Sequence, residues 1–134
     1  MITKPVLTLA DVDAILAAAR AEAVRNRWEV TIAVVDDGGF LQGLARMDGA
    51  SKFSSQMAEH KARTAALSRR ETKGFEELIA GGRLAFLTAP GLKAMLEGGV
   101  PVLHEGHLVG AVGVSGVKSH EDAQVARAGI AALG

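Results

Sequence analysis

The chain has 134 residues, and its 15 basic and 15 acidic side chains cancel, so no net charge would attract a polyanion. One tryptophan, four phenylalanines and no tyrosine make up the aromatic residues, whereas nucleic-acid-binding domains combine a basic stripe with aromatic stacking platforms. We therefore expect no nucleic-acid partner. The absence of cysteine excludes disulfides, thiolate nucleophiles and thiolate-held metal clusters.

Length and hydropathy favour a single domain over residues 1–134. No apolar run approaches the roughly 18 residues that span a bilayer. Acidic residues begin at Asp11, which is too early for the apolar core of a signal peptide. We therefore expect a cytoplasmic protein with no membrane partner. Apolar residues make up 49% of the chain, a large share for a small domain, which points to subunit interfaces.

The first third of the chain predicts a helix followed by a hairpin. Thr8, with an acid three residues later, is typical of a helix N-cap, and the apolar spacing continues to about Asn26. Two segments rich in β-branched and apolar residues, 28–35 and 40–47, then predict strands. The run 36–39 (DDGG) between them predicts a tight turn.

The middle of the chain predicts two helices and an irregular segment. Ser51 caps a helix that runs to about Ser68 and whose apolar residues share one face: Phe53, Met57, Thr64 and Leu67, with His60 near them. Thr72 caps a short helix. Residues 81–99, rich in glycine, predict a strand fragment and a short helix.

The last third predicts a second hairpin and a final helix. Segments 100–103 and 107–114 are strands joined by a turn at 105–106, and a capping pattern at Ser119 begins an alanine-rich helix. Because sequential hairpins pair antiparallel, the element order predicts an α+β fold. We expect an antiparallel sheet of about five strands flanked by helices.

Three sequence blocks carry a resemblance to a known family. They are VVDDGGFLQGLARMDGA (34–50), HKARTAA (60–66) and GGVPVLHEGHLVGAVGVSG (98–116), and Asp122 follows them. On these residues the chain resembles the HbpS/GlcG-like proteins, a family also found as the C-terminal domain of PduO-type proteins. The block order and spacing agree over nearly the whole chain.

The resemblance implies a profilin-like α/β sandwich that assembles into dimers or higher homo-oligomers. Several members are similar in binding haem or assisting its breakdown, and others belong to catabolic operons, so membership constrains the fold more than the chemistry. The resemblance also implies a haem ligand near the first helix in some relatives, but residues 8–27 of this chain hold no His, Met, Tyr or Cys.

The glycine-rich strand excludes two kinds of site. GVSG around Ser115 lacks the spacing of a nucleophile elbow, and no GxGxxG or GxxxxGK phosphate loop is present. Gly110 and Gly113 allow either close approach by a helix or another subunit, or the floor of a ligand pocket that includes Ser115. Gly98, Gly99 and the following Pro101 form either a plain turn or a backbone concavity that binds an anion.

Polar residues of the second helix are the main candidates for chemistry. Lys61 and Thr64 are neighbours on one helical surface, and a lysine among alanines needs a partner. Arg46 and Asp48, at the end of the second strand, are the expected neighbours. Either Asp48 pairs with Lys61, or these charges clamp a carboxylate.

The histidines leave several alternatives open. His104 and His107 flank a tight turn and are candidate metal ligands, although hairpin tips are normally solvated. His60 is either a packed core or interface residue or an axial haem ligand. Met57 is the second plausible axial donor, and Arg46 or Lys61 would pair with the haem propionates.

Two functions of different classes follow. The first is a haem-binding or haem-handling protein whose cofactor lies between the second helix and the glycine-rich strands. The second is an enzyme or sensor for a small organic acid, with Lys61, His60 or Asp48 as acid–base groups. A third hypothesis is that the protein is a non-catalytic oligomeric accessory protein.

Overall fold

The computed structural model describes all residues, 1–134. It contains a four-stranded antiparallel sheet in the order β2-β1-β4-β3. The elements in chain order are α1 (Leu9–Arg25), β1 (Thr31–Asp36), β2 (Leu41–Arg46), α2 (Lys52–Ser68), α3 (Thr72–Ala80), the 3-10 helix η1 (Leu84–Thr88), β3 (Gly99–His104), β4 (His107–Ser115) and α4 (Ser119–Ala131). The predicted α+β class is confirmed, and every predicted long helix is present.

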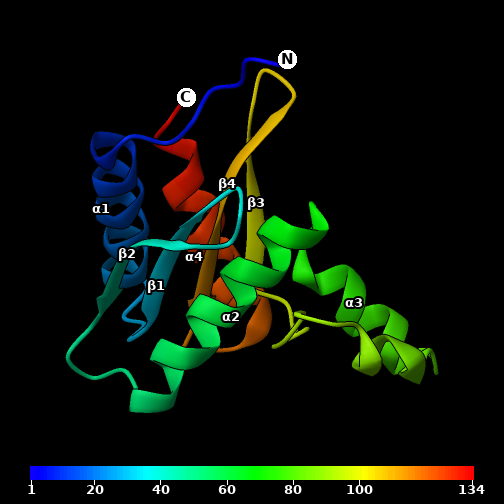
Figure 1. The fold of residues 1–134 in the computed structure, drawn as a ribbon. Coiled ribbons are helices and arrows are strands. Elements are labelled where there is room, and N and C mark those ends of the chain that lie inside the picture. The colour runs from blue at the N-terminus through cyan, green and yellow to red at the C-terminus, as the bar shows by residue number, and fades with distance from the viewer.

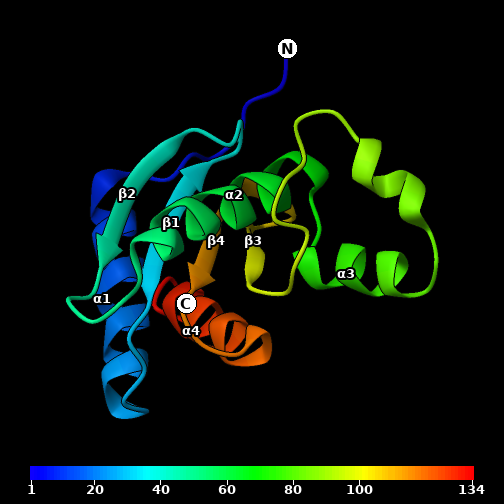
Figure 2. The same cartoon turned by 90° about the horizontal axis from the view of Figure 1, so that it is seen from below.

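The sheet is covered on both faces (Figures 1 and 2). Helices α1 and α4 lie side by side on one face, and α2 crosses the other. Helix α3 and η1 project beyond the β3 edge. The larger core lies between the sheet and α1 and α4, and a smaller one, mostly of alanine, lies under α2. No helix is both long and apolar enough to cross a membrane.

Tight packing of α2 corrects one prediction. Its buried face consists of small residues around Lys61, chiefly Ala58 and Ala62, whereas Phe53 is 65% and Leu67 is 43% exposed. The physical reason is Gly113 of β4, since a Cβ built there would lie 2.0 Å from the Ala58 carbonyl oxygen. Large side chains do not fit between backbones this close, so the larger residues of α2 face outward. The close-approach interpretation of Gly113 is thereby confirmed.

The segment before β3 corrects the expected strand count. Residues 81–98 contain η1 and irregular backbone but no strand, so the sheet has four strands and not about five. Glycines with positive φ at 82, 91 and 98 interrupt any extended run. Short apolar pieces in this segment pack on α3 and on each other instead, as in the tilted pair formed by Phe75 and Phe86.

The start of α1 is a complete capping box, as predicted. The Thr8 hydroxyl accepts from the Asp11 backbone N–H, and the Asp11 carboxylate accepts from the Thr8 backbone N–H and hydroxyl. The backbone hydrogen bond from Thr8, followed by the hydroxyl bond, lowers the pKa of Asp11. A lowered pKa in the folded state means that this contribution to stability is present above the ordinary value of 3.8 and is lost as pH falls through the folded value.

Replacing Thr8 with alanine should therefore lower the free energy of unfolding by about 1 kcal/mol at neutral pH, because the helix loses its cap. The deficit should shrink under acidic conditions, where protonated Asp11 no longer accepts both bonds in the wild type. Urea unfolding at neutral and acidic pH measures both values. A deficit that grows on acidification would contradict this account.

Candidate functional site

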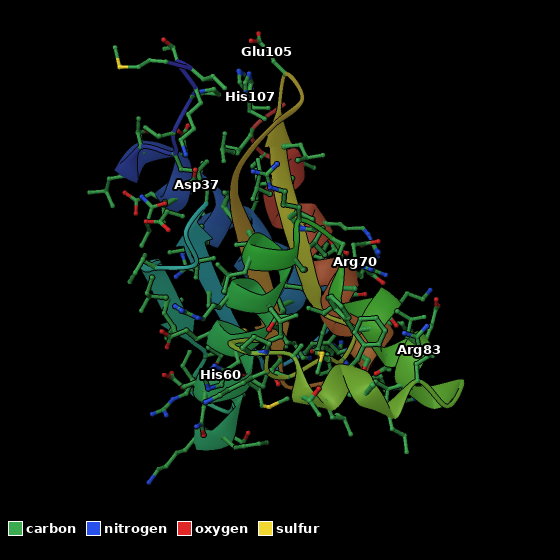
Figure 3. All side chains as sticks on the ribbon, turned by 45° about the vertical axis from the view of Figure 1, so that its right-hand side comes forward. Asp37, His60, Arg70, Arg83, Glu105 and His107 are labelled. Carbon is green, nitrogen blue, oxygen red and sulfur yellow. The ribbon has the colours of Figure 1, made fainter.

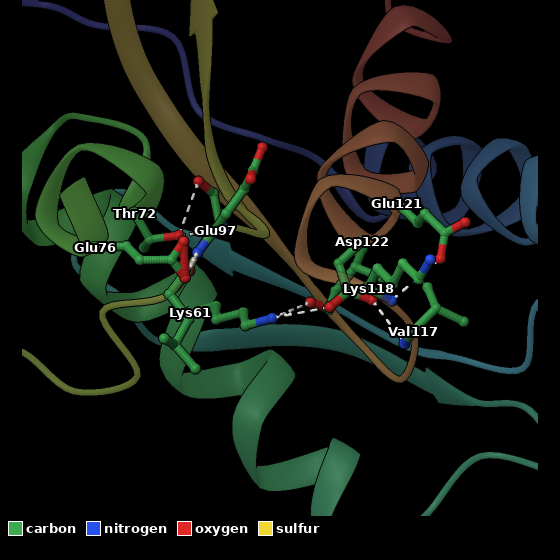
Figure 4. Close-up of polar contacts among 11 residues, drawn as sticks. Lys61, Thr72, Glu76, Glu97, Val117, Lys118, Glu121 and Asp122 are labelled. Carbon is green, nitrogen blue, oxygen red and sulfur yellow. Dashed lines mark hydrogen bonds and ion pairs between the residues drawn. The ribbon is translucent and has the colours of Figure 1, made fainter. Parts of the chain in front are cut away.

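Lys61 forms a buried ion pair with Asp122, which joins α2 to α4 across the end of β4 (Figure 4). The Lys61 Nζ donates to Asp122 Oδ2 at 3.1 Å and to the Val114 carbonyl oxygen at 3.0 Å. The other Asp122 oxygen accepts from the Val117 backbone N–H at 3.1 Å. Lys61 is 2% and Asp122 1% exposed. Every charged atom therefore has a protein partner.

This pair corrects the expected partnership of Lys61 with Asp48. Asp48 follows the edge strand β2 and is exposed, whereas Lys61 points over the centre of the sheet toward Asp122. Burial raises the pKa of Asp122, and the Lys61 ammonium and the Val117 N–H offset part of that effect. The geometry makes Lys61 a structural residue, so it no longer serves as a candidate propionate partner or acid–base group.

From the sequence, Asp122 belongs to the capping run 119–122 and to the family resemblance, and no functional role is predicted for it. The signal that could have found it is the set of small or apolar neighbours that follow, Ala123, Val125 and Ala126, all buried. An acid with such neighbours needs a buried cation, and Lys61 is the buried cation of α2.

The Gly98–Gly99 segment is a packing site and does not form the open concavity that was one of its two interpretations. Both glycines are buried, and a Cβ at Gly99 would lie 2.4 Å from the Lys61 carbonyl oxygen. The Gly99 N–H donates to the Thr72 hydroxyl at 2.8 Å, and Pro101 has no N–H to offer. Ser115, half-buried at the end of β4, pairs with Thr31 in the sheet.

Thr72 is the first residue of α3 and not its N-cap, contrary to the prediction from the sequence. It was expected to cap α3, but Glu71 occupies the N-cap position and Thr72 is completely buried. Its hydroxyl donates to the Leu96 carbonyl oxygen and accepts from the Gly99 N–H. Thr72 therefore fastens the irregular segment before β3 to α3.

Replacing Thr72 with valine should lower the free energy of unfolding by about 1–3 kcal/mol, since a buried N–H and a carbonyl lose their partner. Amide exchange at Gly99 should accelerate as well. Thr72→Ser is the matched control, because it keeps the hydroxyl. Equal stability of the valine and serine variants would show that the hydrogen bonds contribute nothing.

Arg46 and Asp48 do lie together, as expected, but away from Lys61. With Arg20, Glu29, Ala45 and Met47 they line a polar pocket of about 340 Å³ beside β2. The guanidiniums of Arg20 and Arg46 form no ion pair, because neither has a carboxylate oxygen within 4.0 Å. Glu29 accepts from the Gly49 backbone N–H at 3.2 Å. The pocket thus offers two unpaired cations.

Met57 and His60 are half-buried on α2, and neither lines any of the four pockets described here. Thr64 is buried, and its hydroxyl bonds both the N–H and the carbonyl oxygen of Lys93. The expected cavity between this helix and the glycine-rich strands is therefore not one of these pockets. Figure 3 shows His60 far from the hairpin tip that carries His107.

The two hairpin histidines are opposite each other in the β3–β4 register, but they line different pockets. His107 lines a small polar pocket with Lys4, Asp37 and Arg69. His104 lines a pocket of about 420 Å³ in which six of nine lining residues are hydrophobic; the other eight are Pro5, Val6, Leu7, Asp11, Ala14, Val109, Ala132 and Leu133. This imidazole pocket, as we call it, lies where the N-terminal segment, the hairpin and the end of α4 meet (Figure 1). No group of three or more potential metal ligands occurs in the chain.

The comparisons with known proteins agree with this architecture. Fold and sequence together define one class: the chain belongs to the HbpS-like family, whose model, described as "Haem degrading protein HbpS-like", matches residues 7–131. The chain is 54% identical over 115 residues to Protein GlcG of Escherichia coli strain K12, which is 86% of this chain and 85% of that protein. The resemblance in the three sequence blocks is thereby confirmed.

Two solved structures share the fold closely. A double mutant of HbpS from Streptomyces reticuli has a TM-score of 0.90 and 34% identity, covering all of this chain and 91% of that one. A complex of PduOC with haem has a TM-score of 0.86 and 26% identity, covering 96% of this chain and 95% of that one. Haem is thus a ligand of a protein with this fold.

Proposed function

We propose that this protein binds haem and takes part in haem handling, with the imidazole pocket as its site. The observation that carries the proposal is the position of His104, which lines a pocket in which six of the nine lining residues are hydrophobic. Haem needs an apolar slot and usually an axial nitrogen, sulfur or oxygen donor. Membership of the HbpS-like family and the haem complex of PduOC support the same ligand class.

The residues of the pocket fit the group by their chemistry. The imidazole of His104 would supply the axial nitrogen, and the side chains of Leu7, Val109 and Leu133 would pack against the macrocycle. The Asp11 carboxylate is held by Thr8, so its charge is already engaged at the pocket wall. Bound haem would supply redox-active iron, and this chain's own part is to bind it and limit its contact with water.

Titration of the purified protein with hemin tests the proposal. We expect a shifted Soret band at micromolar hemin that His104→Ala abolishes or strongly changes. His107→Ala, at the same hairpin tip but facing a polar pocket, is the matched control and should behave as wild type. His60→Ala separates this site from the one predicted on α2. No Soret shift, or a shift lost only in His60→Ala, would contradict the assignment.

A second candidate function has its own observation in the pocket beside β2. Arg20 and Arg46 present two unpaired guanidiniums that suit a small carboxylate, the ligand class of the organic-acid alternative. A thermal-shift screen of hydroxy and keto acids should then find a stabilising ligand whose effect is lost in Arg46→Gln. Arg127→Gln, which removes an exposed arginine on α4, is the control. A screen without a stabilising acid removes this candidate.

We further propose that the protein self-associates. Several large apolar side chains are exposed, among them Phe40 at 67%, Phe53 at 65% and Leu103 at 63%. Apolar surface of this kind marks an interaction site when it is contiguous. Light scattering after size exclusion should give a mass of two or more chains at micromolar concentration. A monomeric mass under these conditions would contradict the proposal.

A further inference from the structure

An apolar pocket that none of these functions uses lies in the part of the molecule beyond the β3 edge, between α3, η1 and the segment 92–96. Its volume is about 530 Å³, larger than the imidazole pocket, and seven of its nine lining residues are hydrophobic. Ile79, Leu87, Leu92, Met95 and Leu96 supply most of the apolar wall. We call it the α3 pocket. Its volume lies within the range typical of small-molecule sites.

Two buried threonines hold the irregular wall of the α3 pocket. The Thr64 hydroxyl bonds Lys93 at both its N–H, at 3.0 Å, and its carbonyl oxygen, while the Thr72 hydroxyl bonds the Leu96 carbonyl. Figure 4 shows a third attachment, the Glu97 N–H donating to the Glu76 carboxylate at 3.4 Å. The wall is therefore fixed in advance, which reduces the ordering that a ligand would have to impose.

One of the four non-glycine residues with positive φ lies in the same wall. Ala94 has a φ of 50°, in the left-handed region that disfavours residues with a Cβ. Such strain persists only where surrounding contacts hold it, and it is concentrated at ligand sites. Here the threonine bonds to Lys93 and Leu96 hold the backbone on either side of Ala94. The strained residue lines the α3 pocket.

The α3 pocket has one available cation, and its one carboxylate already accepts a backbone hydrogen bond. Lys93 is exposed and has no carboxylate oxygen within 4.0 Å, so its ammonium is available. Glu76, the other charged lining residue, already accepts a backbone hydrogen bond from Glu97. A ligand with an apolar body and one negative group therefore matches the wall and the free cation together.

We propose that the α3 pocket binds an apolar monocarboxylate, with its hydrocarbon part against Ile79, Leu92 and Met95 and its carboxylate at Lys93. This site is separate from the imidazole pocket and does not depend on haem binding. The ligand class is an aliphatic acid of medium length or an aromatic acid of similar size.

Amide chemical-shift titrations with three probes of one chain length test the proposal: sodium octanoate, 1-octanol and octylamine. We expect octanoate to bind most tightly and to shift the amides of residues 76–80 and 92–97. Lys93→Gln should weaken octanoate binding by about two- to fivefold, as for an exposed ion pair, and leave octanol binding unchanged. Lys73→Gln, which removes an exposed lysine on α3, is the matched control.

A pocket-filling variant, Ala80→Trp, should remove binding of all three probes, with its thermal midpoint showing that it folds. Its hemin titration should match wild type, which separates this site from the imidazole pocket. Tighter binding of octylamine than octanoate, shifts outside the α3 pocket, or an unchanged octanoate affinity in Lys93→Gln would overturn the proposal. So would a drop in oligomer mass caused by Ala80→Trp, since a second chain would then cover the pocket.

Discussion

Replacing Lys61 with methionine should lower the free energy of unfolding by about 3–5 kcal/mol, the cost of leaving a buried charge without its partner. The variant leaves Asp122, which is 1% exposed, with only the Val117 N–H as a hydrogen-bond donor. It also removes the donor to the Val114 carbonyl oxygen. Urea unfolding followed by circular dichroism measures the loss.

The double variant Lys61→Met with Asp122→Leu is the informative control. Removing both charges leaves an apolar site of similar volume, and such replacements often change the free energy of unfolding little. We therefore expect the double variant to recover most of the lost stability. Lys52→Met, an exposed lysine at the start of the same helix, should change little. A Lys61→Met variant as stable as wild type would show that Asp122 finds another partner.

The pH dependence of this variant follows from the raised pKa of Asp122, for which burial is the main cause. A raised pKa in the folded state contributes stability below the ordinary value of 3.8 that is lost as pH rises through the folded value. Without the Lys61 ammonium, which lowers this pKa, the effect becomes larger. The stability deficit of Lys61→Met should therefore be smaller near about pH 4 than near about pH 8.

Replacing Gly113 with alanine should be at least as damaging, with a loss of more than about 3 kcal/mol, beyond the usual range for an added methyl group. The new Cβ would lie 2.0 Å from the Ala58 carbonyl oxygen and 2.5 Å from the Ala62 amide nitrogen. Both are backbone atoms, so a side-chain rotation cannot relieve the clash. Helix α2 must move off the sheet, which also strains the Lys61–Asp122 pair.

Gly38→Ala is the matched control for Gly113→Ala, because its Cβ would meet nothing closer than 3.4 Å and its φ is ordinary. It should fold with nearly wild-type stability. Thermal unfolding of the two variants makes the comparison directly. If Gly113→Ala unfolds within a few degrees of wild type, α2 does not press on β4 as closely as the fold requires.

Local patterns predicted most of the secondary structure because several elements begin or end with their own chemical signal. The Thr8 cap, the Ser51 cap and the DDGG turn act within a few residues, so sequence alone locates them. The Asp36 side chain illustrates this, since it accepts from the N–H groups of Gly38 and Phe40 inside the turn. Antiparallel pairing of each hairpin followed directly.

The candidate site was predicted less well because it depends on contacts between distant residues. Lys61 and Asp122 are far apart in the sequence, and nothing local indicates which acid reaches the lysine. The prediction for the buried face of α2 was wrong for Phe53 and Leu67, which are large apolar residues. The backbones of α2 and β4 approach so closely at Gly113 that only small side chains such as alanine fit between them. His104 was considered for a metal site, but its apolar neighbours come from both ends of the chain.

The most direct test of the haem proposal is chemical-shift mapping with gallium protoporphyrin, a diamagnetic analogue of haem. We predict that the amides that shift belong to the imidazole pocket, with Leu7, Ala14, His104, Val109 and Leu133 among them. The backbone around Met57 and His60 on α2 should not respond. Shifts centred on α2, or no shifts with saturating porphyrin, would contradict the assignment of haem to this pocket.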